Sequence, residues 1–186
     1  MCGISGIIHK NASPKDLSPI GQELTKMLWS LRHRGMDSTG MTIAGENSEE
    51  DYILRLWTEN PRQSLETVTD KIESLGGSIK TKNQQEQYIR LTIDYKGDIK
   101  TIAESLYNTP QIQIHSIGKG SEIIKDLGTA ENINEIHRLD SMKGSHGIGH
   151  VRLATESRVD ITHSHPFWAY PFPDISVVHN GQLTNY

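Results

Sequence analysis

The chain has 186 residues and a formal net charge of −4, and 34% of its residues are hydrophobic. That length suits one domain, or one domain with a modest insertion, and the negative charge argues against a nucleic-acid partner. The single cysteine excludes an internal disulfide and is typical of a reducing compartment. No stretch approaches the roughly 18–20 apolar residues that span a membrane, and the first residues lack the regions of a signal peptide. We therefore expect a soluble, cytoplasmic protein with no membrane partner.

The single cysteine, Cys2, directly follows the initiator methionine. Removal of Met1, which is favoured when the next side chain is small, would leave a residue that carries both a thiol and a free α-amino group. A terminal amine has a pKa of about 7.7–8.0 and can act as a base near neutral pH, and a thiol needs such a base to become a nucleophile. A small hydrophobic residue in a first strand fits the position equally well, so both interpretations of Cys2 stay open here.

Hydrophobic spacing predicts the first two elements. A short apolar run predicts a buried strand at 3–9. Apolar residues three and four positions apart then predict an amphipathic helix at 19–33, with Ser18 as its N-cap and Pro19 in its first turn.

A polar, glycine-bounded turn at 32–40 follows, and it is too rich in charged and hydroxyl side chains for a simple connection. Beyond it, residues 41–44 and 52–57 are expected to pair as a hairpin around the polar loop 45–51.

Residues 59–142 differ in character from the rest and are predicted to form a compact α+β insertion. Helices are expected at 61–75, 98–107 and 130–140, and strands at 86–95 and 111–117. The charges of this insertion are scattered, as on a solvated surface, and its histidine His115 is expected to be structural. We therefore expect the chemistry outside this insertion.

Two polar features stand in or beside apolar segments near the C-terminal end. Arg152 lies in a short apolar segment, and a buried guanidinium needs an anion, which can be a bound carboxylate or an internal acidic side chain. Asn180-Gly181 follows an apolar strand predicted at 175–180. An Asn-Gly pair is first a turn signal, but it can also aim a side-chain amide and a backbone N–H at one point, as an oxyanion hole requires.

The histidines of the C-terminal third offer another hypothesis. His163 and His165, with His150 and His179, could supply metal ligands, because alternate residues of a strand share a face. Carboxylates and cysteines at ligand spacing are missing from this segment, so we expect no metal.

The chain resembles the class II glutamine amidotransferase domain of the N-terminal nucleophile hydrolases. The resemblance lies in MCGISG at the start, RHRGMDSTG at 32–40, GHVRLAT at 149–155, and HSHPF with HNGQLTN at 163–167 and 179–185. The last segment looks most like the amidotransferase subunits of glutamate synthase-like and methylamine–glutamate synthase-like systems. The resemblance implies an α+β fold of the αββα type, with two antiparallel sheets between helical layers.

The resemblance also implies roles at the matching positions. Cys2 would be the nucleophile and its own α-amino group the base. Arg152, with Thr155 beside it, would bind the α-carboxylate of glutamine, and Asn180 and Gly181 would form the oxyanion hole. The residues that would shape the pocket beside the nucleophile are Arg34, Gly35 and Asp37, while His165 would be structural.

The implied reaction is hydrolysis of glutamine to glutamate and ammonia through a γ-glutamyl thioester on the cysteine. Ammonia would pass to a partner synthase, and no cofactor is implied. The alternatives are a non-catalytic, amidotransferase-like regulatory subunit and a histidine-based metal-binding module.

Three departures from the family pattern bear on these expectations. Leu153 stands where many members have an aromatic residue, and Glu156 follows Thr155 where some have histidine. No residue here can be matched to the aspartate that binds the glutamine α-amino group. We therefore expect the fold of residues 1–186 to be incomplete at its C-terminal end, with little activity and poor solubility alone, and the natural protein to be longer.

Overall fold

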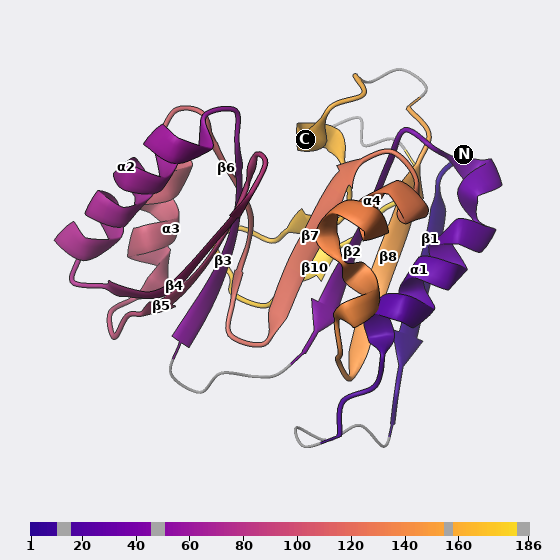
Figure 1. Ribbon diagram of the computed structural model, residues 1–186, viewed down its shortest axis with the longest axis horizontal. Coiled ribbons are helices and arrows are strands. Elements are labelled where there is room, and N and C mark those ends of the chain that lie inside the picture. The colour runs from indigo at the N-terminus through magenta and orange to yellow at the C-terminus, as the bar shows by residue number, and fades with distance from the viewer. Residues whose placement is uncertain (11–15, 46–50, 155–157, 182–186) are drawn as a thin grey trace. The chain divides into compact units, whose positions relative to one another are not determined.

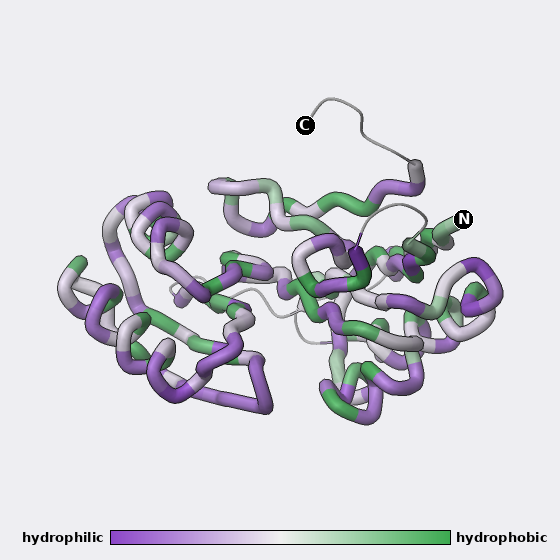
Figure 2. The backbone as a smooth tube through the Cα atoms, turned by 90° about the horizontal axis from the view of Figure 1, so that it is seen from above, coloured by the Kyte–Doolittle hydropathy of each residue, from purple (hydrophilic) through white to green (hydrophobic). Residues whose placement is uncertain are grey.

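The computed structural model in Figure 1 describes residues 1–10, 16–45, 51–154 and 158–181. The chain forms two compact units. Unit 1 comprises Met1–Glu46, Ile123–Phe167 and Ser176–Tyr186, and unit 2 comprises Asn47–Glu122 and Trp168–Ile175. Each unit has its own hydrophobic core, and hydrophobic residues alternate with hydrophilic ones along the chain in both units (Figure 2).

Unit 1 is built on a four-stranded sheet of order β1-β8-β2-β7. Both β1 and β2 pair with β8 in the antiparallel sense. The strands are β1 Gly3–Ile8, β2 Ser38–Ala44, β7 Ser121–Leu127 and β8 His146–Arg152. The strand predicted at 3–9 is therefore confirmed.

Two helices, α1 (Ile20–Ser30) and α4 (Ala130–His137), cover one face of this sheet (Figure 1). The apolar stripe of α1 is fully buried in the core, through Ile20, Leu24 and Leu28. Burial of such a stripe stabilises the fold by about 1.5–3 kcal/mol for each large apolar side chain. A short 3-10 helix at Leu139–Ser141 follows α4.

The predicted helix at 19–33 is correct in type but not at its ends. Ser18 is not the N-cap, because its backbone N–H and C=O both pair with Gly144 and so hold it in an extended bridge; Pro19 takes the cap position instead. At the other end the α-helix stops at Ser30, and Arg32–Arg34 forms a separate 3-10 turn.

Unit 2 is built on a second antiparallel sheet, of order β4-β5-β3-β6. Its strands are β3 Asp51–Thr58, β4 Ser78–Gln85, β5 Tyr88–Asp94 and β6 Ile112–Gly118. The helices α2 (Pro61–Ser74) and α3 (Ile99–Tyr107) lie together on one face of this sheet (Figure 1). The predicted helices at 61–75 and 98–107 and strands at 86–95 and 111–117 are confirmed within a few residues at each end.

The hairpin expected from 41–44 and 52–57 does not form. Both segments are strands, but the first lies in β2 and pairs with β8, whereas the second lies in β3 and pairs with β5 and β6. The two strands are therefore members of different sheets.

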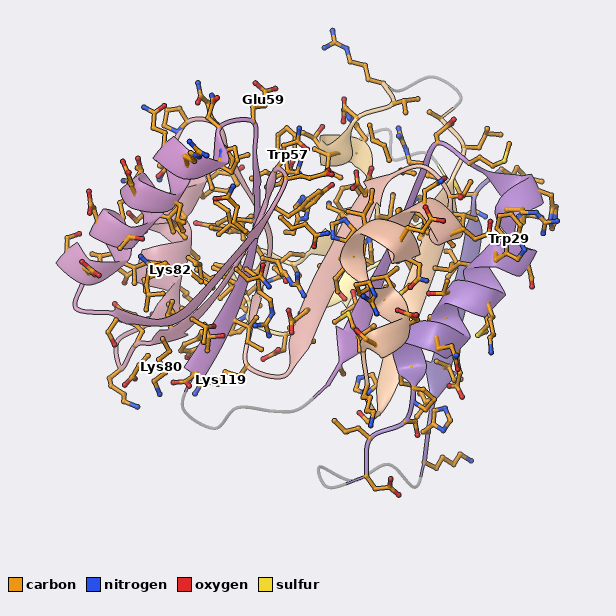
Figure 3. The ribbon with its side chains drawn as sticks, viewed as in Figure 1. Trp29, Trp57, Glu59, Lys80, Lys82 and Lys119 are labelled. Carbon is orange, nitrogen blue, oxygen red and sulfur yellow. The ribbon has the colours of Figure 1, made fainter. Side chains whose placement is uncertain are left out.

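Strands β4 and β7 are among those that the sequence did not predict. Strand β4 is polar and almost wholly exposed because it lies at a sheet edge; Lys80 and Lys82 extend from it (Figure 3). Strand β7 carries the buried Lys125 directly after the buried Ile123 and Ile124, and three buried residues in a row break the usual alternation.

The strand expected at 175–180 is shorter than predicted. Only Ser176–Val177 forms a strand, β10, and it pairs with β9 at Phe167–Trp168. A 3-10 turn at Ile161–His163 precedes β9.

The predicted insertion and unit 2 coincide over residues 59–122. Residues 47–58 also lie in unit 2, whereas 123–142, including α4, lie in unit 1. Within the described ranges, no helix is both long and apolar enough to cross a membrane.

The helices and antiparallel sheets of the two units make this a mixed α+β fold, which is compatible with an N-terminal nucleophile sandwich.

Candidate active site

Strand register brings the predicted site residues of unit 1 to one end of its sheet. Gly3 of β1 lies opposite Val151, and Ser38 of β2 lies opposite Arg152. Cys2 directly precedes β1, and Asp37 directly precedes β2. The start of β1, the start of β2 and the end of β8 therefore meet at the same edge.

The carbonyl oxygen of Cys2 is the point at which three distant segments meet. It accepts a hydrogen bond from Arg34 Nε at 3.0 Å and another from Asn180 Nδ2 at 3.0 Å. The thiol is partly exposed, and Sγ lies 3.8 Å from the carbonyl oxygen of Leu153. Because Met1 precedes it in the structure, the nitrogen of Cys2 is a peptide nitrogen here. Two of the predicted site residues therefore hold the backbone of the third.

Asp37 ties the 32–40 turn to the chain that leaves β8. Its Oδ2 accepts the N–H of Ala154 at 2.7 Å, and its own N–H donates to the carbonyl of Arg152 at 3.1 Å. Gly35 packs so closely here that a Cβ would lie 2.3 Å from the carbonyl carbon of Arg152 and 2.5 Å from the nitrogen of Leu153. The Gly35–Asp37 segment thus sets the path of the residues around the thiol.

Arg152 ends β8 and is only 5% exposed. Its Nη2 donates to the carbonyl oxygen of Arg158 at 2.9 Å, so part of the guanidinium is engaged with the backbone of the following loop. Thr155, the predicted neighbour of this arginine in substrate binding, lies outside the described residues, as does Glu156. The arrangement leaves a buried, planar cation beside the cysteine segment.

Asn180 and Gly181 are both exposed and follow β10. One N–H of the Asn180 amide is used on the Cys2 carbonyl, and the amide group has a second. Gly181 has a φ of +157°, a backbone conformation that favours glycine. A Cβ there would also lie 2.9 Å from the ring of His179, so the position suits no larger residue.

Next to this turn lie two histidines whose side chains stack. The rings of His150 and His165 are 4.3 Å apart and inclined by 18°. Burial lowers the pKa of His150 to about 4, with a smaller contribution from the charge of Arg152. Burial also lowers the pKa of His165 to about 3, helped by the neighbouring His150 and Lys125. Both rings are therefore neutral at physiological pH.

The histidines do not assemble a ligand set in the part of the chain that is described. There, no group of three or more His, Cys, Asp or Glu side chains is placed to hold a metal ion. His163 instead bonds to the carboxylate of Asp160 at 2.7 Å, apart from the stacked rings.

Lys125 on β7 was missed by the sequence analysis. It is 3% exposed, and burial lowers its pKa to about 7. Its Nζ donates to the carbonyl oxygens of Ser164 and Pro166 at 2.8 and 3.3 Å. The available signal was a lysine directly after two isoleucines, Ile123 and Ile124, in a segment that was not predicted to be a strand.

Comparison with known sequences finds relatives of this chain. No family model matches the chain. A protein of Methanothermobacter thermautotrophicus named "Putative glutamine amidotransferase" is 36% identical over 194 residues, which cover 100% of this chain and 63% of that protein. "Glutamine amidotransferase-like protein GlxB" of Rhizobium meliloti is 30% identical over 188 residues, covering 100% of this chain and 60% of that protein.

The chain is related in sequence to glutamine amidotransferases. An amidophosphoribosyltransferase of Methanothermobacter thermautotrophicus, a class II glutamine amidotransferase, is 33% identical over 69 residues, 36% of this chain and 15% of that enzyme. The chain spans about three fifths of the length of the first two relatives, the putative glutamine amidotransferase and GlxB. The resemblance to class II glutamine amidotransferases noted from the motifs is thereby confirmed.

The chemical groups at this end of the sheet suit a relative of glutamine amidotransferases. It places a thiol, a buried guanidinium and a side-chain amide on neighbouring backbone segments. These are the groups needed to attack an amide carbon, to hold a carboxylate and to meet a developing oxyanion.

Proposed function

We propose that the chain hydrolyses the side-chain amide of glutamine, with Cys2 as an N-terminal nucleophile, and passes the ammonia to a partner synthase. The observation that carries the proposal is the pair of hydrogen bonds from Arg34 and Asn180 to the Cys2 carbonyl oxygen. These bonds hold the backbone of Cys2 from two distant segments, and a nucleophile has to be held in position to attack its substrate.

The proposed reaction begins after Met1 is removed. The Cys2 thiol attacks the carboxamide carbon of glutamine, and its proton passes to the free α-amino group, whose pKa of about 8 suits a base near neutral pH. The amide oxygen becomes negative in the tetrahedral intermediate. The second N–H of the Asn180 amide and the N–H of Gly181 would donate to that oxygen.

Collapse of the intermediate breaks the C–N bond, and the leaving nitrogen takes the proton from the α-amino group and departs as ammonia. Water, deprotonated by the same amine, then attacks the γ-glutamyl thioester. The C–S bond breaks, glutamate leaves and the thiol is restored. No redox change occurs, so no cofactor is needed.

Arg152 is the proposed anchor for the substrate. Its guanidinium offers a planar fork to the α-carboxylate of glutamine, with Thr155 beside it. Arg34 and Asp37 bond to the backbone of Cys2 and Ala154, which favours a supporting role for them: they hold the thiol and the neighbouring loop in place.

The proposal extends to the fold and the setting. The antiparallel sheet of unit 1, with α1 on one face, supports the αββα sandwich as the proposed architecture, and the α+β segment 59–142 is proposed as an insertion. A reducing cytoplasm would keep the nucleophilic thiol free. A glutamate synthase-like enzyme is the proposed ammonia acceptor.

The direct test is glutamate and ammonia release from glutamine by the full-length protein. Wild type should turn over, Cys2→Ala should not, and Ser5→Ala should match wild type. Ser5 is a suited control because it lies on the same strand and its hydroxyl has no hydrogen-bond partner among the described residues. Release that survives Cys2→Ala, or none from wild type lacking Met1, would overturn the proposal.

A further inference from the structure

The backbone of His179, directly before Asn180, is held at its N–H and at its carbonyl oxygen by two histidine rings. His150 Nε2 lies 3.0 Å from the carbonyl oxygen of His179, and the N–H of His179 lies 3.2 Å from His165 Nδ1. The histidine pair, His150 and His165, therefore bonds to the residue directly before the Asn180-Gly181 turn.

Each of these bonds requires one particular tautomer. A carbonyl oxygen only accepts, so His150 must carry its proton on Nε2. A backbone N–H only donates, so His165 must leave Nδ1 unprotonated. A neutral ring satisfies each requirement, and protonation of His165 on Nδ1 would break its bond.

The pair itself is rigidly supported. His150 is fully buried on the central strand β8, and its ring stacks on that of His165. Lys125 fixes the carbonyl groups on either side of His165, at Ser164 and Pro166. Gly40 allows a close approach here, since a Cβ on it would lie 2.2 Å from the carbonyl oxygen of His165.

We propose that His150 and His165 are positioning residues that set the Asn180-Gly181 turn against Cys2. The catalytic consequence of this positioning rests on the function proposed above, whereas the positioning itself does not. The two rings bond to the backbone of His179. The next residue, Asn180, then bonds through its Nδ2 to the Cys2 carbonyl oxygen at 3.0 Å.

The electrostatic surroundings keep the pair neutral, as this role requires. The charged and titratable groups facing His165 are His150, Lys125, His179 and Arg152, all of which disfavour a proton on it. Burial lowers the pKa of His150 most; its hydrogen bond to the His179 carbonyl raises this pKa, and the charges of Arg152 and His179 lower it. The turn is therefore held across the whole neutral range.

The test uses paired substitutions in the full-length protein. His165→Phe keeps a ring to stack but has no acceptor, whereas His165→Asn replaces Nδ1 with an amide oxygen that can accept and does not titrate. His163→Gln is the control, because His163 lies in the same segment but outside the pair. The first readout is amide hydrogen exchange of the peptide containing residues 176–181 at neutral pH, which does not depend on activity.

We expect exchange in this peptide to be about 10-fold faster in His165→Phe, as loss of one hydrogen bond implies, and near wild type in His165→Asn and His163→Gln. Where wild type turns over glutamine, kcat should fall in His165→Phe with little change in KM and recover in His165→Asn. Unchanged exchange in His165→Phe would overturn the positioning role, and faster exchange with unchanged kcat would overturn its link to catalysis. An inactive wild type would defeat the proposed function alone, since exchange still decides the positioning role.

If His165→Phe does not fold, His150 gives an independent test. His150→Gln keeps an N–H donor at the Nε2 position, and His150→Phe does not. Faster exchange in His150→Phe than in His150→Gln supports the proposal, and equal exchange in the two overturns it.

Discussion

The side-chain amide of Asn180 donates a hydrogen bond of 3.0 Å to the carbonyl oxygen of Cys2, although 178 positions separate the two residues. The backbone of the residue that carries the thiol and a side-chain amide near the other end of the described residues are thus joined by one direct contact. Arg34 bonds to the same oxygen, so the cysteine backbone has two fixed donors. These two bonds fix the position of the residue that carries the thiol.

Asn180→Ala should lower kcat for glutamine hydrolysis by about 10²–10³ with little change in KM, because an oxyanion exists only in the transition state. Steady-state kinetics of the full-length protein measure both constants. A change in KM alone would show that Asn180 binds the ground-state substrate and is not an oxyanion donor.

Arg152→Lys should raise KM for glutamine by about 10-fold or more. Lysine keeps the charge but loses the planar fork, and a lost charge-assisted hydrogen bond costs about 1.5–3 kcal/mol. Arg158→Lys is the matched control, because the exposed Arg158 bonds to Arg152 through its backbone carbonyl. Equal KM values in the two variants would contradict the role of Arg152.

Gly35→Ala should destabilise unit 1 by about 1–3 kcal/mol. The added Cβ meets backbone atoms of Arg152 and Leu153 at 2.3–2.5 Å, and these atoms cannot move without disturbing the end of β8. Gly6→Ala is the control in the same sheet, since its Cβ would find only contacts of 3.5 Å. Thermal unfolding should separate the two by several degrees; equal midpoints would mean that the β8 end yields easily.

Elements of the fold could be predicted where the pattern that specifies them lies within a short stretch of sequence. The stripe of Ile20, Leu24 and Leu28 specifies α1 by spacing alone, and all three are fully buried. Strand partners carry no such signal. The hairpin predicted from 41–44 and 52–57 failed because each strand pairs with segments far along the chain, and the polar edge strand β4 had no apolar alternation to detect.

In the site, too, local motifs could be recognised from the sequence, whereas contacts between distant segments could not. The motifs drew attention to Cys2, Arg34 and Asn180, and the structure brings all three together. They could not reveal that His150 and His165 hold the backbone of His179, since those contacts depend on how β8 and the 163–167 segment pack. From the sequence, His150 was a candidate metal ligand only, and His165 a candidate metal ligand or a structural residue.

Lys125→Met should flatten the pH dependence of stability between about pH 7 and 10.5. The pKa of Lys125 is lowered from 10.5 to about 7 by burial, so in that window the unfolded chain binds a proton that the folded chain does not. The free energy of unfolding of wild type therefore rises with pH through this window, by at most about 1.4 kcal/mol per pH unit from this group. Denaturant titrations at several pH values measure the slope.

The control for Lys125 is Lys143→Met, which removes an exposed lysine from unit 1. It should leave the slope as in wild type. If Lys125→Met and wild type had the same slope, Lys125 would be charged in the folded state throughout this range.

The most direct measurement for the central claim is intact-mass spectrometry of the full-length protein after reaction with a diazo-ketone analogue of glutamine. We predict a chain that has lost Met1 and carries one adduct per molecule on Cys2, with excess glutamine slowing the labelling and Cys2→Ser abolishing it. Retention of Met1, or labelling that persists in Cys2→Ser, would contradict the assignment of Cys2 as the N-terminal nucleophile.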